Sequence, residues 1–306
     1  MNFPLSSSIQ ACRQLTKQAN SNFVPAFALL PKEKRQAIEI LYAYNRFTDD
    51  IADSSNTSHC RLQKLNQWKN SLNAILNNSN EPLPDCDGLV YLPALKMIVD
   101  KYEIPKEPFF QLIDGMKTDI ERKPFATFDD CLTYCDQVAG SVGIASLSIW
   151  GTARPLASEC VLDAAKACSI AFQWTNIIRD LREDYQSGRI YLPQSDLQFF
   201  DITPAQFGTM LEGSPGKPNE KLYNLLAFQL DRCKTYYERS LPLFEFINRD
   251  SLRAFGLMWN YYYALYVKMV GNPMLVTQST RLRLPFLQKV RLWLCWRFLP
   301  YKSGGR

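Results

Sequence analysis

Two clusters of acidic residues have the types and the spacing that chemistry could use. The first lies in the stretch YAYNRFTDDIADSS, which holds Asp49, Asp50 and Asp53. The second lies in FQWTNIIRDLREDYQ, which holds Asp180 and Asp184. Like charges three or four residues apart on a helix repel each other. Each cluster is therefore either a solvated helix end or a site for a positively charged ligand.

Each cluster ends a polar stripe on a helix that is otherwise apolar. At about 100° per residue, each stripe covers a sector of no more than about 80°. The flanking side chains, such as Ile38, Phe47 and Trp174, are of the kind that forms a core. The stripes are therefore expected to face an enclosed space. They consist of Tyr42, Arg46, Asp49 and Asp53 on one helix and of Gln173, Asn176, Asp180 and Asp184 on the other.

A cation bound to a diphosphate would satisfy these enclosed acids, which are costly to bury without a partner. Carboxylate and amide oxygens without His or Cys suit Mg²⁺, which typically takes one or two carboxylates together with substrate phosphates and water. A solvated helix end or an ion-pair network would explain one acidic stripe, but two matched stripes favour the metal. Neighbouring arginines could grip the same diphosphate by forked hydrogen bonds; they are Arg46, Arg179, Arg182 and Arg189.

The remaining composition removes other chemistries. The single histidine, His59, lies in a polar stretch, which removes histidine-based triads and zinc sites. The nine cysteines form no CxxC pair, so a reducing compartment is expected. Residues 281–306 carry seven Lys or Arg and no acid, within a chain of net charge +5. Because nucleic-acid binding needs basic residues spread over a face, no nucleic-acid partner is expected.

The elements that carry these stripes are helices. In 306 residues with 46% hydrophobic content, apolar residues recur every three to four positions and glycine is sparse, which predicts a single all-α domain. Exposed loops are expected over 77–88 and 212–220, with a looser chain after residue 197. We expect helices over 7–18, 31–53, 61–78, 89–102, 106–120, 128–151, 157–185, 219–247 and 250–270.

These motifs resemble those of the squalene/phytoene synthase family. The family's first motif, D-x-x-x-D, is matched by Asp49–Asp53, and its second by Asp180–Asp184 within NIIRDLREDYQSGRIYLP. The stretches LLPKEKRQAIEILYAYNRFTDDIAD and YCDQVAGSVGIASLSIWG are also similar, so that the resemblance covers about residues 20–270. The N-terminal half resembles bacterial presqualene diphosphate and squalene synthases more than phytoene synthases. Where many relatives carry YCY, this chain has Asp136 at the third position, which we expect to face water.

The resemblance implies an isoprenoid synthase helical bundle around a central apolar cavity, with the two aspartate motifs facing each other. It implies Mg²⁺-dependent head-to-head (1′–1) joining of two allylic diphosphates through a cyclopropylcarbinyl diphosphate. Two farnesyl diphosphates would lead through presqualene diphosphate towards squalene, hopanoids or C30 carotenoids, and two geranylgeranyl diphosphates to phytoene. The C15 substrate is preferred, and use of NADPH stays open. A non-catalytic prenyl-lipid-binding or assembly factor is the alternative from another class.

The resemblance also assigns roles position by position. Tyr42, Arg46 and Tyr134 match catalytic residues of the family. The expected metal ligands are Asp49, Asp53, Asn176, Asp180 and Asp184. The expected substrate-binding residues are Phe23, Phe27, Gln173, Arg179, Arg189 and Tyr262, the last chosen from three consecutive tyrosines.

Residues 281–306 form a basic aromatic tail that follows the synthase domain of residues 1–280. The tail is too interrupted by charge to span a bilayer. Its mixture of aromatic and basic residues is typical of an anchor lying on anionic lipid. A last helix packed on the bundle would show the same mixture of residues. The anchor residues would be Phe286, Trp293, Trp296 and Phe298. The N-terminal stretch has no long apolar region, so we expect a cytoplasmic protein, with peripheral contact at the inner membrane face.

Overall fold

Helices form almost everywhere that the apolar spacing predicts them. The computed structural model describes residues 3–19, 21, 23–79, 86–213 and 219–298. Within these ranges there is no strand, and Thr152 and Ile247 pair as an isolated bridge. The all-α, single-domain fold is thereby confirmed. Parts of the expected loops over 77–88 and 212–220, and the end of the expected tail, lie outside the described residues.

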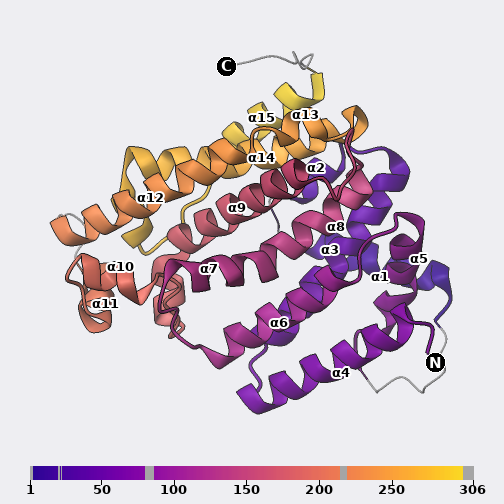
Figure 1. Ribbon diagram of the computed structural model, residues 1–306, viewed down its shortest axis with the longest axis horizontal. Coiled ribbons are helices and arrows are strands. Elements are labelled where there is room, and N and C mark those ends of the chain that lie inside the picture. The colour runs from indigo at the N-terminus through magenta and orange to yellow at the C-terminus, as the bar shows by residue number, and fades with distance from the viewer. Residues whose placement is uncertain (1–2, 20, 22, 80–85, 214–218, 299–306) are drawn as a thin grey trace.

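The first half of the chain builds one side of the bundle, with α3 behind α8 and with α4 and α6 along the lower edge in Figure 1. Its elements are α1 (Leu5–Gln18), α2 (Val24–Phe27), α3 (Lys32–Asp53), α4 (Ser58–Leu76), η1 (Leu89–Tyr91), α5 (Leu92–Lys101), α6 (Glu107–Glu121), α7 (Phe128–Cys135), η2 (Asp136–Gly140) and α8 (Ser141–Trp150).

The second half adds α9 through the middle and α12, α14 and α15 along the upper edge (Figure 1). Its elements are α9 (Glu159–Gln186), α10 (Gln194–Phe199), α11 (Pro204–Glu212), α12 (Glu220–Ser240), α13 (Leu243–Phe246), α14 (Arg249–Gly271), η3 (Pro273–Thr277) and α15 (Phe286–Phe298).

Packing on one side of α3 turns its polar stripe towards the interior of the bundle. The buried side chains of Tyr44 and Thr48 contact α4 and α6: the Tyr44 hydroxyl donates to the carbonyl of Phe109 at 2.8 Å, and Trp68 Nε1 donates to Thr48 Oγ1 at 2.9 Å. Buried polar atoms are tolerated when they are paired in this way. The opposite face of the helix, which carries Tyr42, is left free to line a site.

The second stripe is oriented in the same manner by α12. Trp174 and Thr175 on α9 are fully buried, and Thr175 Oγ1 lies 2.9 Å from the hydroxyl of Tyr237 on α12. On another side of α9, α8 approaches closely because Gly143 has no side chain: a Cβ there would lie 2.4 Å from Ser169 Oγ. The two packed sides leave Gln173 and its stripe facing α3.

Three expectations about helix limits need correction. The helix expected over 219–247 ends at Ser240, because Pro242 cannot continue the hydrogen-bond ladder, and α13 follows separately. The looser chain expected after residue 197 contains α11, which begins with a Thr203–Gln206 capping box that the sequence displays. The helix expected over 128–151 is continuous but contains η2, a π-helical turn.

A buried ion pair fixes the chain that follows α9. Asp196, which is 7% exposed, accepts hydrogen bonds from Gln229 Nε2 at 2.7 Å and from Arg232 Nη1 at 2.6 Å. The Arg232 guanidinium also lies 3.8 Å from the ring centroid of Phe128 on α7. These contacts hold α10, which carries Asp196, against α7 and α12.

Replacing Asp196 by Ala should lower the free energy of unfolding by about 3–5 kcal/mol, because it leaves the arginine buried without its partner. Chemical denaturation followed by circular dichroism would measure the loss. The matched control is Glu238→Ala on α12, the helix that carries Arg232. The pair between Glu238 and Lys234 is exposed and 3.8 Å long, so it should contribute little to stability. Equal losses in the two variants would contradict the structural role of Asp196.

Candidate active site

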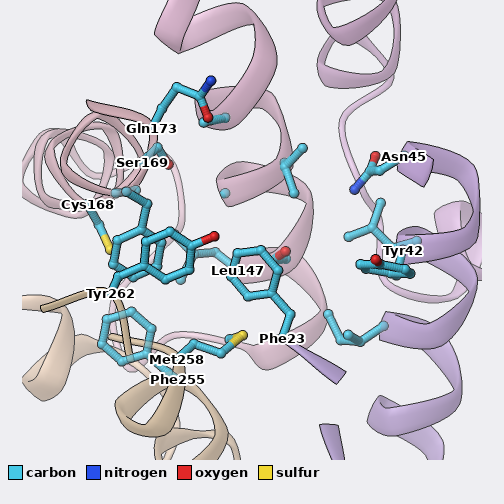
Figure 2. Close-up of a pocket in the computed structure, with 18 of the residues that line it drawn as sticks. Phe23, Tyr42, Asn45, Leu147, Cys168, Ser169, Gln173, Phe255, Met258 and Tyr262 are labelled. Atoms are coloured by element: carbon cyan, nitrogen blue, oxygen red, sulfur yellow. The ribbon is translucent and has the colours of Figure 1, made fainter. Parts of the chain in front are cut away.

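An apolar cavity of about 270 Å³ lies between α2, α3, α8, α9 and α14. Figure 2 shows Gln173 and Asn45 at one end, Phe255 and Met258 at the other, and Leu147 between them. The ring of Tyr262 stacks between Phe23, at 5.2 Å, and Phe172, at 4.5 Å. The cavity therefore has a polar mouth and an aromatic and aliphatic interior.

The first stripe and the first two residues of the second, Gln173 and Asn176, meet at this mouth, whereas Asp180 and Asp184 line neither the cavity nor the hollows beside it. Two hollows open beside the cavity, and α3 supplies Tyr42, Arg46 and Asp49 to both of them. Asp180 is hydrogen-bonded to Arg179, and Asp184 lies close enough to Asp180 and Arg189 for their charges to affect its pKa. The expected residues that line the cavity or the two hollows are Phe23, Phe27, Tyr42, Arg46, Asp49, Asp53, Tyr134, Gln173, Asn176, Arg179, Arg189 and Tyr262.

One aspartate of each stripe has a raised pKa. Withdrawal from water, with repulsion from Asp53, raises the pKa of Asp49 to about 7, although its side chain still faces the open hollow. Burial, with repulsion from Asp180, raises the pKa of Asp184 to about 7. Burial also raises the pKa of Asp180, but hydrogen bonds from Arg179 and Arg281 outweigh it, and the pKa lies below its ordinary value. The mouth therefore favours a cationic ligand.

Asp180 is held by two arginine forks. Arg179 donates from Nε and Nη2 at 2.7 and 2.5 Å, and Arg281 donates from the same two atoms at 2.9 and 2.6 Å. Arg281 is the first residue of the segment that the sequence sets apart as a tail, and sequence reasoning missed it. No sequence signal could have placed it here, because 101 residues separate it from Asp180.

A second missed feature is a cluster of two tyrosines around Asp119. The hydroxyl of Tyr134 donates to Asp119 Oδ2 at 2.9 Å, and that of Tyr191 donates to Oδ1 at 2.7 Å. The rings of Tyr134 and Tyr191 stack at 5.4 Å. Burial raises the pKa of Asp119 despite these bonds and the nearby charge of Arg189. The cluster fixes the orientation of Tyr134; Tyr191 belongs to the GRIYLP string, which was the available signal.

The structure separates other residues from the site. Arg182, expected to lie with the diphosphate-binding arginines, instead donates to the carbonyls of Leu211 and Thr277, and its role is structural. Asp50, in contrast, does line one of the two hollows, where it pairs with Arg46 at 2.7 Å. Asp136 is half-exposed on the surface, 3.7 Å from Lys166.

The tyrosine run over 261–263 is resolved by its contacts. Tyr262 lines the cavity, whereas the hydroxyl of Tyr261 donates to the carbonyl of Lys289 and the ring of Tyr263 stacks on Trp259 at 4.7 Å. Successive residues on a helix point about 100° apart, so one of three neighbours is expected to face a given space.

One buried oxygen suits a hard divalent cation, although no three acidic, Cys or His side chains among the described residues are grouped so that they could hold a metal ion by themselves. Asn176 Oδ1 is buried and has no hydrogen-bond partner among the described residues, which is costly unless a ligand supplies one. It lies on the stripe of Asp180 and Asp184, one helical turn before Asp180, so amide and carboxylate oxygens share one face. Arg189 Nε is likewise a buried donor without a partner in the described part of the chain. The first atom suits a metal and the second suits an anion.

The all-α bundle has the fold of the squalene synthases. Residues 16–288 match the family model for squalene/phytoene synthase, and the chain belongs to that family. Members of the family are prenyltransferases that condense prenyl diphosphates head to head, and this chain is one of these enzymes.

Relatives of the chain carry the names of three kinds of synthase. A phytoene synthase from Arthrospira platensis is 35% identical over 241 residues, covering 76% of this chain and 74% of the relative. One from Mycobacterium tuberculosis is 31% identical over 278 residues, covering 91% and 86%. The structure of a dehydrosqualene synthase in complex with a ligand superposes with a TM-score of 0.80 at 26% identity, over 96% of both chains. A squalene synthase from Alicyclobacillus acidocaldarius shares the fold, with a TM-score of 0.75 at 22% identity over 87% of this chain and 94% of that one.

Replacing Asp49 by Asn should stabilise the metal-free protein strongly at about pH 8 and much less at about pH 5. The folded-state pKa of about 7 exceeds the unfolded value of 3.8, so at intermediate pH the folded protein holds a proton that the unfolded chain releases. The stability contributed by this protonation is full below pH 3.8, falls progressively as the pH rises, and is completely lost above about pH 7. Thermal unfolding in the presence of a chelator should show a midpoint a few degrees higher for the variant at the higher pH.

Asp50→Asn is the matched control for this comparison. Asp50 is the next residue on α3 but already has a cationic partner in Arg46, so its replacement should not stabilise the protein at either pH. A gain for Asp50→Asn as large as that for Asp49→Asn would contradict the uncompensated charge at Asp49.

Proposed function

We propose that this prenyltransferase condenses two farnesyl diphosphates head to head through presqualene diphosphate, with Mg²⁺ as its cofactor. The observation that carries the proposal is a hydrocarbon-lined cavity whose mouth is bordered by the aspartates of the first stripe, by Asn176 of the second and by several arginines. A prenyl chain matches the cavity and a diphosphate matches the mouth. The product would lead towards squalene, hopanoids or a C30 carotenoid.

The side chains of the mouth would hold the two diphosphates. Arg46, Arg179 and Arg189 can donate charge-assisted hydrogen bonds to diphosphate oxygens. Asp49, Asp53, Asn176, Asp180 and Asp184 would hold Mg²⁺. When bound, the metal would neutralise negative charge on the leaving group. Water is kept from the reacting carbons by the apolar wall.

The reaction needs no protein nucleophile. The C–O bond of one substrate breaks, its electron pair leaves with the diphosphate, and C1 bonds to the second chain; one proton is lost as the cyclopropane ring closes. Phe23 and Phe27 present aromatic faces that can stabilise the cation. Tyr134 donates its own proton to Asp119, so its oxygen keeps lone pairs free to face positive charge.

The alternative product is phytoene from two geranylgeranyl diphosphates, which the names of the sequence relatives favour. The alternatives are separated by giving the purified protein Mg²⁺ with either substrate, with and without NADPH, and identifying the products by mass spectrometry. We expect presqualene diphosphate from the C15 substrate, and squalene only if NADPH is used. A C40 product alone would replace the proposal by the alternative, and no product from either substrate would favour a non-catalytic prenyl-lipid-binding protein.

The double variant Asp180→Asn with Asp184→Asn should lower turnover by at least about 100-fold, because charge on the leaving diphosphate would lose its counterion. Circular dichroism should show unchanged helix content. Glu183→Gln, between the two aspartates but 58% exposed, is the matched control and should retain turnover. Retained turnover in the double variant would overturn the metal assignment.

We also propose that α15 rests on an anionic membrane surface. Its outward face is apolar, with Phe286 77%, Leu287 79% and Phe298 69% exposed, and Val290 and Leu294 lie on the same face. Residues 281–298 hold five basic residues and no acid, a combination that favours anionic lipid. None of the described helices is long and apolar enough to cross a membrane.

The two tryptophans expected to anchor this contact face the bundle instead. Trp293 Nε1 donates to the carbonyl of Pro25 at 3.2 Å. The ring of Trp296 lies where a Cβ on Gly256 would be, at 2.2 Å. They attach α15 to α2 and α14, which line the cavity, so a membrane under α15 would lie beside the cavity wall.

The double variant Leu287→Glu with Leu294→Glu should abolish binding to phosphatidylglycerol vesicles in a sedimentation assay, because it places acids on the outward face. Phe199→Glu is the matched control, since Phe199 is 78% exposed but lies on α10, and it should bind as the parent protein does. Failure of the parent protein to bind these vesicles would overturn the membrane contact. The contact would also be overturned if the double variant still bound vesicles but no longer associated with itself.

A further inference from the structure

The end of the cavity farthest from the aspartates is closed by Trp150. On each surrounding helix the lining residues run from the polar mouth to this end. On α9 they run from Asn176 to Ala165, about 16 Å along the helix axis at about 1.5 Å per residue. On α14 they run from Tyr262 to Phe255, and on α8 they end at Trp150. The ring of Trp150 lies 5.9 Å from that of Phe255, so the two rings form a floor.

One strip of the wall above this floor is made of small side chains. Ala139 on η2 is followed by Gly143 and Ser146 on α8, and Ser169 faces them from α9. Small residues leave width for a chain and no obstacle along its length. The first large side chain that α8 places below Leu147 is the indole of Trp150.

The position of Trp150 is fixed by its backbone. Its carbonyl accepts hydrogen bonds from Lys34 Nζ at 2.6 Å and from Ser251 Oγ at 3.0 Å, so α3 and α14 both hold the end of α8. Gly151 follows with a φ of +74°, a conformation that ends the helix and that other residues rarely adopt. The floor therefore cannot recede without breaking contacts to two other helices.

The size of the indole, rather than its polar atom, explains its presence. Trp150 is 7% exposed, yet its Nε1 has no hydrogen-bond partner among the residues that the structure describes. A buried tryptophan N–H usually finds a partner, and an unpaired one costs stability. What the side chain contributes at this position is a large rigid volume.

We propose that Trp150 sets the maximum length of the prenyl chain that the enzyme accepts, admitting a C15 chain and rejecting a C20 chain. This inference rests on the proposed function, because it takes the cavity as the prenyl site. A chain whose diphosphate lies at the aspartates extends towards the floor, and the added isoprene unit of the longer substrate meets the indole. Trp150 is thus a specificity-determining residue of the proposed reaction.

The test compares the parent protein with Trp150→Phe and Trp150→Ala. Binding of farnesyl and geranylgeranyl thiodiphosphate in the presence of Mg²⁺ is measured by calorimetry, and the two natural diphosphates are competed in the product assay. Trp150→Ala should raise the ratio of C20 to C15 affinity by at least about tenfold, the effect typical of small steric changes in an apolar pocket. Trp150→Phe should move it in the same direction by less, which keeps the test valid if the alanine variant folds poorly.

The matched control is Trp174→Phe. Trp174 is fully buried and its Nε1 also has no partner within the described ranges, but it packs edge-on against Phe128 rather than lining the cavity. The Trp174→Phe variant should leave the ratio of C20 to C15 affinity unchanged. Equal affinity of the parent protein for both chains, or an unchanged ratio in both Trp150 variants, would overturn the assignment even if condensation is observed. A shifted affinity ratio without product would instead retain Trp150 as the length limit and overturn the proposed reaction.

Discussion

The constraint on which the rest of the structure depends is negative charge held beside a dry cavity. Asp49 and Asp184 lie where burial raises the pKa of each to about 7, so the metal-free protein keeps both charges at a cost in stability. The helices that carry them tolerate this because their other faces are well satisfied, as the Trp68–Thr48 hydrogen bond behind α3 illustrates. Side chains on the outer faces of α3 and α9 stabilise the fold, and side chains on their inner faces form the candidate active site.

The negative charges of the two aspartates of the second stripe are compensated to different degrees. Asp180 has both oxygens occupied by arginines, whereas Asp184 experiences mainly the negative charge of its neighbour. A metal that bound Asp180 would have to displace one of the two arginines. Arg281 is the more accessible, with 39% of its side chain exposed against 8% for Arg179. The segment between η3 and α15 is therefore mechanically connected to the mouth of the cavity.

The sequence was informative where a signal lies within one helix. Both stripes can be read from it because residues three and four apart share a face, and the all-α class follows from the same periodicity. Asp119, Tyr191 and Arg281 could not be placed in this way, since each reaches the site through contacts between distant elements. The choice of Tyr262 from its run of three likewise depended on how α14 is rotated against α2 and α9, which local spacing does not determine.

The π-helical turn η2 sets the phase between two halves of one long helix. Tyr134, before the turn, reaches the hollow at the mouth, and Val142, after it, lines the cavity. A π turn accommodates one more residue than an α turn, so η2 already absorbs one extra residue, and a further residue inserted within 136–140 would rotate the upstream half by about 100° relative to the downstream half. Tyr134 would then turn away from Asp119 while every downstream contact stayed in place. Chain length in this short stretch is thus as strictly constrained as the identity of the tyrosine itself.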